Sequence, residues 1–476
     1  MSSNKVHPIP DCPVRDPCIS TVESDFRKSE HSGSSTVSTF LDDGKLPSII
    51  RKKGISAKMT FLNFLKGMIG PGCLSLPLAL KEAGLWSGLF LIIFYGFLNN
   101  YCMLQLVHCS QYLSRKKGDT CLDYGSVASE ACSNSFNWIR PRKNLARIIV
   151  NTAIIFLQVG ICSVFYVFVA VHTQEIIEQY WSPGFSKHIY MLIVLVPFIL
   201  INFLRTLRII AVISIIGNIC MVTSLAFIFQ HLIRQPHQIG SLPWINDFDG
   251  IMMATGSILY SFEGQAMVLP MENKLKHPEK MVGPFGVLSC GMGVVTFVYA
   301  SCGFLGYMTY GKKVEGSITL NLPDQPEFTV VKCLLVFVVF FGFVIQQYVI
   351  VEMTWPTIKQ WIYKNKFFGE ACRKRMIFPE LLYRTFLVIF AMGFAMAIPN
   401  LEQIIPLVGV TAGMMLAFVF PATIDSITFL PGMFRKLANI NSRNPTNSKD
   451  NTCLVILGVF GCIAGLQSSI RDLIGK

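Results

Sequence analysis

Long apolar stretches recur along the chain and are separated by short segments that hold most of its Lys and Arg residues. A helix needs about 20 mostly apolar residues to cross the hydrocarbon layer of a bilayer, and eleven stretches meet this length. They lie near residues 60–82, 84–112, 145–172, 188–206, 208–232, 250–273, 281–311, 328–355, 380–399, 401–425 and 452–470. The pattern therefore predicts an all-α membrane protein with about 11 transmembrane helices.

The distribution of positive charge predicts the orientation of these helices. If residues 1–59 are cytoplasmic, clusters of Lys and Arg fall in the predicted inner loops, for example at residues 359–375. The predicted outer loops carry only scattered cations, which are Lys81, Lys187, Arg234, Lys312 and Lys313. Because Lys and Arg accumulate in cytoplasmic loops, we expect a cytoplasmic N-terminus and, for an odd number of helices, a C-terminus on the opposite side.

Composition excludes several classes of function. Charged residues make up 14% of the chain, against about 25% in soluble domains, so a soluble enzyme is excluded. The net charge is +13, but the cations lie between membrane spans, which argues against a nucleic acid partner. No HExxH zinc motif occurs and no histidine lies at the centre of a span. We therefore predict neither enzymatic activity nor a cofactor or metal site.

The predicted helices divide into groups of five, five and one. Residues 1–57 are rich in Ser, Pro and charge and poor in large apolar residues, which predicts a disordered cytosolic tail. Residues 58–476 form the predicted transmembrane domain. Within it, the first repeat covers about 60–232, the second about 250–425, and the extra helix about 452–470.

The first span of each group of five is interrupted by Gly and Pro. Span 1 contains Gly70, Pro71 and Gly72, and span 6 contains Glu263 and Gly264 among other breaking or polar residues. Those others are Ser261, Gln265 and Pro270. Such residues break the helical hydrogen-bond ladder, and broken backbone inside a membrane is tolerated where it lines a cavity or packs against protein. Two broken helices at matching positions indicate a transporter binding site.

The break in span 1 has a specific chemical use. A half-helix that begins after this break offers free N–H groups and a positive dipole end, which suit a carboxylate. Pro71 has no N–H, so the donors would come from Gly70, Gly72 and Cys73. The alternative is a glycine-rich packing face with a proline kink, which would bind no ligand.

Two acidic residues inside predicted spans are candidates for ion coupling, because charge in the hydrocarbon layer is costly. Glu263 lies in the middle of span 6, where it either carries a proton or only accepts hydrogen bonds from loose N–H groups. Glu352 lies near the inner end of span 8, where it is either a second proton carrier or a hydrated acid. A sodium site needs several oxygen ligands such as Ser and Thr hydroxyls. The threonines of span 8, Thr329 and Thr354, lie only at its ends, so sodium coupling is disfavoured.

Several segments resemble one known family. Residues 65–84 read LKGMIGPGCLSLPLALKEAG, and residues 261–281 read SFEGQAMVLPMENKLKHPEKM. Residues 345–356 read IQQYVIVEMTWP, and residues 398–410 read IPNLEQIIPLVGV. In this order they resemble the proton-coupled amino acid transporter family within the amino acid/auxin permeases, over residues 60–470.

The resemblance implies a leucine-transporter-like fold, with spans 1–5 and 6–10 as inverted repeats and a small neutral amino acid bound between spans 1 and 6. The chain also departs from the family. Members often read KGNIGTG where this chain has KGMIGPG, so Met68 and Pro71 replace a polar residue and a hydroxyl. Asn63 stands where the proton-coupled branch often has a histidine thought to serve coupling. Since Asn63 cannot titrate, Glu263 becomes the first candidate for that role.

Together these patterns predict a secondary transporter of small neutral amino acids that works by alternating access and is coupled to protons. The predicted substrate site is formed by Ile69, Gly70, Pro71, Gly72, Ser261, Phe262, Glu263 and Gly264. Two alternatives stay open, an uncoupled amino acid facilitator and a transport-poor sensor or scaffold that signals through its tail. The sequence leaves open both the oligomeric state and the choice between the plasma membrane and the lysosomal or vacuolar membrane.

Overall fold

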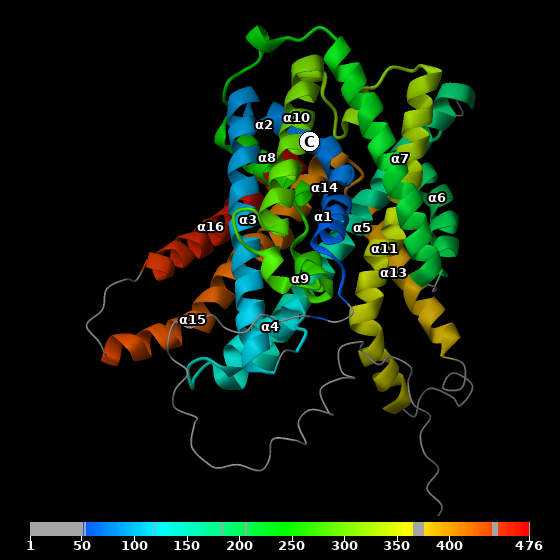
Figure 1. Ribbon diagram of the computed structural model, residues 1–476. Coiled ribbons are helices and arrows are strands. Elements are labelled where there is room, and N and C mark those ends of the chain that lie inside the picture. The colour runs from blue at the N-terminus through cyan, green and yellow to red at the C-terminus, as the bar shows by residue number, and fades with distance from the viewer. Residues whose placement is uncertain are drawn as a thin grey trace, which may run out of the picture.

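The computed structural model describes residues 51, 54–118, 120–181, 184–204, 207–364, 376–439 and 446–475 (Figure 1). These residues are almost entirely helical, and their one isolated β-bridge joins Ile55 to Leu275. Most of the predicted tail, residues 1–57, lies outside the described residues. Its last part, however, is described, and Ile55 pairs with the segment after the second broken helix.

The helices of the first half are α1 (Ala57–Met68), α2 (Leu76–Ala83), α3 (Leu85–Lys116), α4 (Tyr124–Ser133), α5 (Lys143–Trp181), α6 (Lys187–Asn202) and α7 (Leu207–Arg234). Those of the second half are α8 (Phe248–Ser261), α9 (Gln265–Lys274), α10 (Val287–Tyr310), α11 (Pro326–Lys364), α13 (Ile377–Ala397), α14 (Leu401–Val408), α15 (Phe420–Asn439) and α16 (Thr446–Gly475). Short 3₁₀ turns η2 (Pro71–Ser75), η3 (Arg140–Arg142) and η7 (Ile318–Asn321) lie between them, and π-helical turns η8 (Gly409–Gly413) and η9 (Met415–Val419) join α14 to α15.

Eight helices among the described residues are long and apolar enough to cross a membrane. They include α3, α5, α7, α10, α11, α13 and α16, and one further span runs from Leu401 through both π-helical turns to Pro431. The apolar α6 is shorter, with 16 residues. The predicted spans 1 and 6 are absent from this set because each is divided into two short helices. The chain is thus an all-α, multi-pass membrane protein, as predicted, whereas the number of 11 spans stays a prediction.

The outer surface of the bundle is apolar, as expected for a surface in contact with lipid. Phe97 on α3 and Phe297 on α10 are 72% and 73% exposed. The interior is formed around α5 and the span that starts with α14. The most apolar segments of these two spans are 78% and 72% buried, against 22% for that of α13. Since lipid is as apolar as leucine, packing between helices depends on close contact rather than on the exclusion of water.

Two glycines bring the backbones of α8 and α14 into direct contact at the centre of the bundle. A Cβ atom added to Gly409 would lie 1.8 Å from the carbonyl oxygen of Gly256. One added to Gly256 would lie 2.4 Å from the carbonyl oxygen of Pro406. Small residues allow such close approach of membrane helices, so this pair holds the second broken helix against the last span of the second half.

Candidate functional site

Both predicted breaks are present in the structure. The helix α1 ends at Met68, Gly70 is extended, and Pro71 starts η2, because proline cannot donate to the preceding helical turn. The helix α8 ends at Ser261, and α9 starts only at Gln265. The prediction that Pro270 contributes to the break is wrong, because Pro270 lies inside α9. It falls in the second turn of α9, where its missing N–H removes only one helical bond.

The two breaks lie against each other at Gly72 and Ser261. The Ser261 hydroxyl lies 2.7 Å from the carbonyl oxygen of Gly72 and 2.9 Å from that of Ser257. A Cβ atom on Gly72 would lie 3.0 Å from the Cα atom of Ser261. Glycine at residue 72 therefore permits this contact between the two backbones.

A tyrosine from α10 connects the same two breaks. The Tyr299 hydroxyl lies 2.5 Å from the carbonyl oxygen of Met68 and 2.9 Å from that of Ser261, and these are the final residues of α1 and α8. The Gly70 N–H also interacts with this hydroxyl. The side chain is fully buried, and its ring packs against Phe262 with the ring centroids 5.0 Å apart. Helix ends leave carbonyl oxygens without helical partners, and two of them share the single O–H donor of Tyr299.

The α3 helix supports the second break in a similar way. The Asn99 amide donates to the carbonyl oxygen of Phe262 over 3.0 Å. The amide nitrogen of Gln265 donates in turn to the side-chain oxygen of Asn99. Both side chains are buried. This connected group of Tyr299, Asn99 and Gln265 is not predictable from local sequence patterns, although polar residues inside apolar spans are a weak signal of such a role.

The structure also shows how the predicted carboxylate donors are used. The Cys73 N–H already donates to the carbonyl oxygen of Gly70 over 3.2 Å, and the Gly70 N–H interacts with Tyr299. Among the described residues, the Gly72 N–H has no hydrogen-bond partner. In this conformation only one of the three predicted donors is thus free.

The two predicted coupling acids lie in different environments. Glu263 is partly buried in the second break. No Lys or Arg among the described residues forms an ion pair with Glu263. Glu352 is exposed on α11 and belongs to neither break. The structure therefore does not bring these two acids together.

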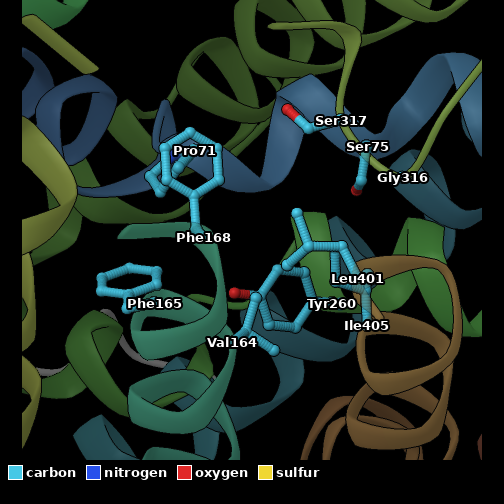
Figure 2. A pocket seen from close by; sticks show the side chains of 10 residues that line it. All are labelled: Pro71, Ser75, Val164, Phe165, Phe168, Tyr260, Gly316, Ser317, Leu401 and Ile405. Carbon is cyan, nitrogen blue, oxygen red and sulfur yellow. The ribbon is translucent and has the colours of Figure 1, made fainter. Parts of the chain in front are cut away.

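A small cavity of about 10 Å³ lies beside the first break. It is lined by Pro71, Ser75, Val164, Phe165, Phe168, Tyr260, Gly316, Ser317, Leu401 and Ile405. Figure 2 shows the rings of Phe165, Phe168 and Tyr260 around this space. Of the eight predicted substrate residues, only Pro71 lines it. A volume of this size holds about one water molecule, so the cavity is too small for an amino acid in this conformation.

The loop before α11 forms one wall of the cavity. The Ser317 hydroxyl lies 2.7 Å from that of Thr319, which lies 2.6 Å from Nε2 of the buried His172. Nδ1 of His172 donates to a backbone carbonyl, so Nε2 accepts from Thr319. Partial burial and the Glu402 carboxylate raise the pKa of the Glu315 carboxyl in this loop above its ordinary value. These contacts hold the wall against α5.

The other end of the site is held by residues that precede α1. The Arg51 guanidinium donates to the carbonyl oxygen of Glu272 and lies 3.4 Å from its carboxylate, which is 1% exposed. The Ile55 N–H donates to the Lys274 carbonyl over 2.8 Å, and the Lys276 N–H donates back to Ile55 over 2.9 Å. The end of α9 is therefore attached to the start of α1, so the two broken helices are linked at this end as well.

Replacing Tyr299 with phenylalanine should weaken the contact between the two breaks. The variant keeps the ring but leaves the carbonyl oxygens of Met68 and Ser261 without this donor, which costs about 1–3 kcal/mol for a buried group. We expect a lower unfolding temperature in detergent and slower amino acid uptake. Tyr307→Phe on the same helix is the control, because the Tyr307 hydroxyl has no hydrogen bond among the described residues. Equal effects of the two substitutions would contradict this role.

Comparison with known proteins agrees with this geometry. Residues 53–471 match the family model described as "Transmembrane amino acid transporter protein". The chain is 32% identical over 425 residues to "Probable amino acid transporter skat-1" of Caenorhabditis elegans, covering 88% of this chain and 90% of the relative. It is 30% identical over 422 residues to "Proton-coupled amino acid transporter-like protein pathetic" of Drosophila melanogaster, covering 87% of this chain and 84% of the relative.

These matches cover both broken helices and nearly the whole described bundle, and they confirm the resemblance noted in spans 1 and 6. The chain belongs to the transmembrane amino acid transporter protein family.

Proposed function

We propose that this protein is a secondary transporter that moves small neutral amino acids by alternating access between its two broken helices. The observation that carries the proposal is the direct contact of the two breaks at Gly72 and Ser261. In a membrane, such backbone is tolerated where it lines a cavity or packs against protein, and half-helix ends suit the charged groups of an amino acid. The family and its relatives support amino acids as the substrate class.

The two breaks offer complementary groups to an amino acid. The free N–H of Gly72, at the start of η2, suits the substrate carboxylate. The carbonyl oxygens of Ser261 and Phe262 suit the ammonium group, once Tyr299 and Asn99 release them. These three contacts would form as the helices separate.

The cavity beside the breaks supports a small, uncharged side chain. Its walls are mainly apolar, and Phe165 and Phe168 from α5 reduce its volume. Among the described residues that line it, none is an acid or a base. A charged side chain would have no partner there and would carry a large desolvation cost.

Proton coupling is best supported at Glu263. Its carboxylate lies in the membrane without an ion pair among the described residues, and a group in this position can exchange a proton as the site opens to either side. Asn63, in α1, cannot carry a proton. Glu352 is exposed on α11 and lies outside both breaks.

The test is uptake of glycine, alanine and proline into liposomes, with and without an inward proton gradient. The wild type should accumulate substrate when the outside is more acidic, because each substrate would enter with a proton. The gradient-driven uptake rate of Glu263→Gln should be at least about tenfold lower than that of the wild type, which corresponds to about 1.4 kcal/mol. The variant should still exchange internal for external substrate. Glu352→Gln is the matched control and should keep its dependence on the gradient. Wild-type uptake that ignores both pH and membrane potential would reject proton coupling.

A second candidate function is an amino acid sensor that transports poorly. The specific observation in its favour is the link between the start of α1 and the end of α9 through Arg51 and Ile55. This link connects the N-terminal tail directly to one half of the site. Substrate binding without transport in any gradient, together with loss of signalling after deletion of residues 1–50, would support the sensor over the transporter.

A further inference from the structure

A strongly basic segment precedes the α5 span. Residues 138–147, here called the basic turn, read WIRPRKNLAR and contain four exposed cations. These are Arg140, Arg142, Lys143 and Arg147. There is no Asp or Glu between Glu130 and Glu175. The basic turn therefore carries a local charge that its own part of the sequence does not neutralise.

Other elements do not neutralise this charge either. Elsewhere in the described chain, cations pair with acids, as Lys332 does with Glu175 over 2.5 Å. Glu130, the acid nearest to the basic turn along the chain, instead pairs with Lys117 over 2.9 Å. No ion pair involves any of the four cations of the basic turn among the described residues. These positive groups are available to an external anion.

The structure holds the basic turn in a defined shape. The Arg140 Nε donates to the carbonyl oxygen of Ser135 over 3.0 Å, and the Arg142 N–H donates to that of Ile139 over 2.9 Å. The stem of Arg147 lies on α4, since a Cβ added to Gly125 would be 3.3 Å from its Cγ. Groups that are held in place lose less entropy when they bind a partner. The backbone of the basic turn, the Arg140 guanidinium and the stem of Arg147 are thus held in place.

The surroundings of the basic turn indicate the kind of partner. It lies at the beginning of the candidate span Arg140–Trp181. Trp138 is 68% exposed beside it, and the first turns of α5 expose Leu145, Ile148 and Ile149. Tryptophan and basic residues together are typical of the boundary between hydrocarbon and water. Exposed apolar residues at this level need lipid around them, which disfavours a soluble acidic protein or a nucleic acid.

We infer that the basic turn binds the headgroups of anionic phospholipids in the adjacent leaflet. Clusters of four or more Lys and Arg next to a membrane helix attract such headgroups, with a contribution that corresponds to about fivefold in affinity for each cation. In this arrangement the lipid phosphates lie against the guanidinium groups while the acyl chains cover the exposed residues of α5. Binding of lipid here does not depend on which substrate is transported.

The test measures how much lipid the purified full-length protein retains from mixed micelles of phosphatidylcholine and phosphatidylserine. The wild type should retain phosphatidylserine in preference to phosphatidylcholine, and less of it as salt increases, because salt screens exposed charges. The triple variant Arg140→Gln, Arg142→Gln, Arg147→Gln should bind phosphatidylserine on the order of 100-fold more weakly. The same three positions changed to Lys should retain it, since the charges remain.

A matched control removes three cations near the opposite end of the bundle, at Arg234, Lys312 and Lys313, each changed to Gln. Arg234 is the last residue of α7, and Lys312 and Lys313 follow α10; their loss should leave lipid retention unchanged. If the triple Gln variant of the basic turn does not fold, Arg142→Gln alone should still bind about fivefold more weakly. Equal retention of the two lipids by the wild type, or equal retention of phosphatidylserine by wild type and Gln variants, would overturn the inference.

Discussion

Replacing Gly72 with valine should abolish amino acid uptake while the protein still reaches the membrane. A Cβ at residue 72 would lie 3.0 Å from the Cα of Ser261 and 3.5 Å from the Tyr260 ring, so a branched side chain must separate the two breaks. That separation would remove the hydrogen bond from the Ser261 hydroxyl to the Gly72 carbonyl. Uptake of labelled alanine into liposomes measures the effect, which should exceed about 100-fold if the site depends on precise geometry.

Gly70→Ala is the control for this prediction. Gly70 lies in the same break, but a Cβ there would have only the Met68 carbonyl oxygen near it, at 4.0 Å. The backbone at residue 70 is extended, which alanine also adopts. We expect Gly70→Ala to keep most of its uptake and Gly72→Ala to be intermediate. Normal uptake by Gly72→Val would show that the contact between the breaks is not needed for transport.

Replacing Arg51 with alanine should destabilise the protein more than breaking an exposed ion pair, because its partner Glu272 is buried. The Glu272 carboxylate is 1% exposed, and without Arg51 it keeps only the distant amide of Gln111, at 3.5 Å. Removal of one partner from a buried ion pair costs about 3–5 kcal/mol. The cost should fall near the lower limit because the Arg51 side chain is 16% exposed. Thermal unfolding in detergent measures it as a decrease in the unfolding temperature.

Two variants make this result interpretable. Lys117→Ala breaks the exposed pair with Glu130, whose side chains are 48% and 22% exposed, and should cost less than about 1 kcal/mol. Adding Glu272→Gln to Arg51→Ala removes the unpaired charge and should restore part of the stability. If Arg51→Ala and Lys117→Ala had equal effects, the attachment of α9 to the start of α1 would contribute little.

The sequence by itself determined the membrane architecture and the location of both breaks. Apolar length predicts a span because backbone polar groups in lipid must be satisfied within a helix, and the structure has such spans as α3, α5 and α11. Pro71 and Gly264 interrupt helices for local reasons, which are a missing N–H and a missing side chain. Properties that depend on a residue and its neighbours along the chain were therefore predictable.

The details of the site were decided only by the tertiary structure. Tyr299, Asn99 and Arg51 act on carbonyl oxygens more than 30 residues away along the chain, and no local pattern specifies which oxygen each one meets. Most of the cavity lining comes from α5, α14 and the loop before α11, and Pro71 alone among the predicted substrate residues lines it. Glu352 was the second candidate for coupling after Glu263, and packing leaves it exposed. Such contacts depend on how helices pack in three dimensions, and that packing brings together residues that the sequence keeps far apart.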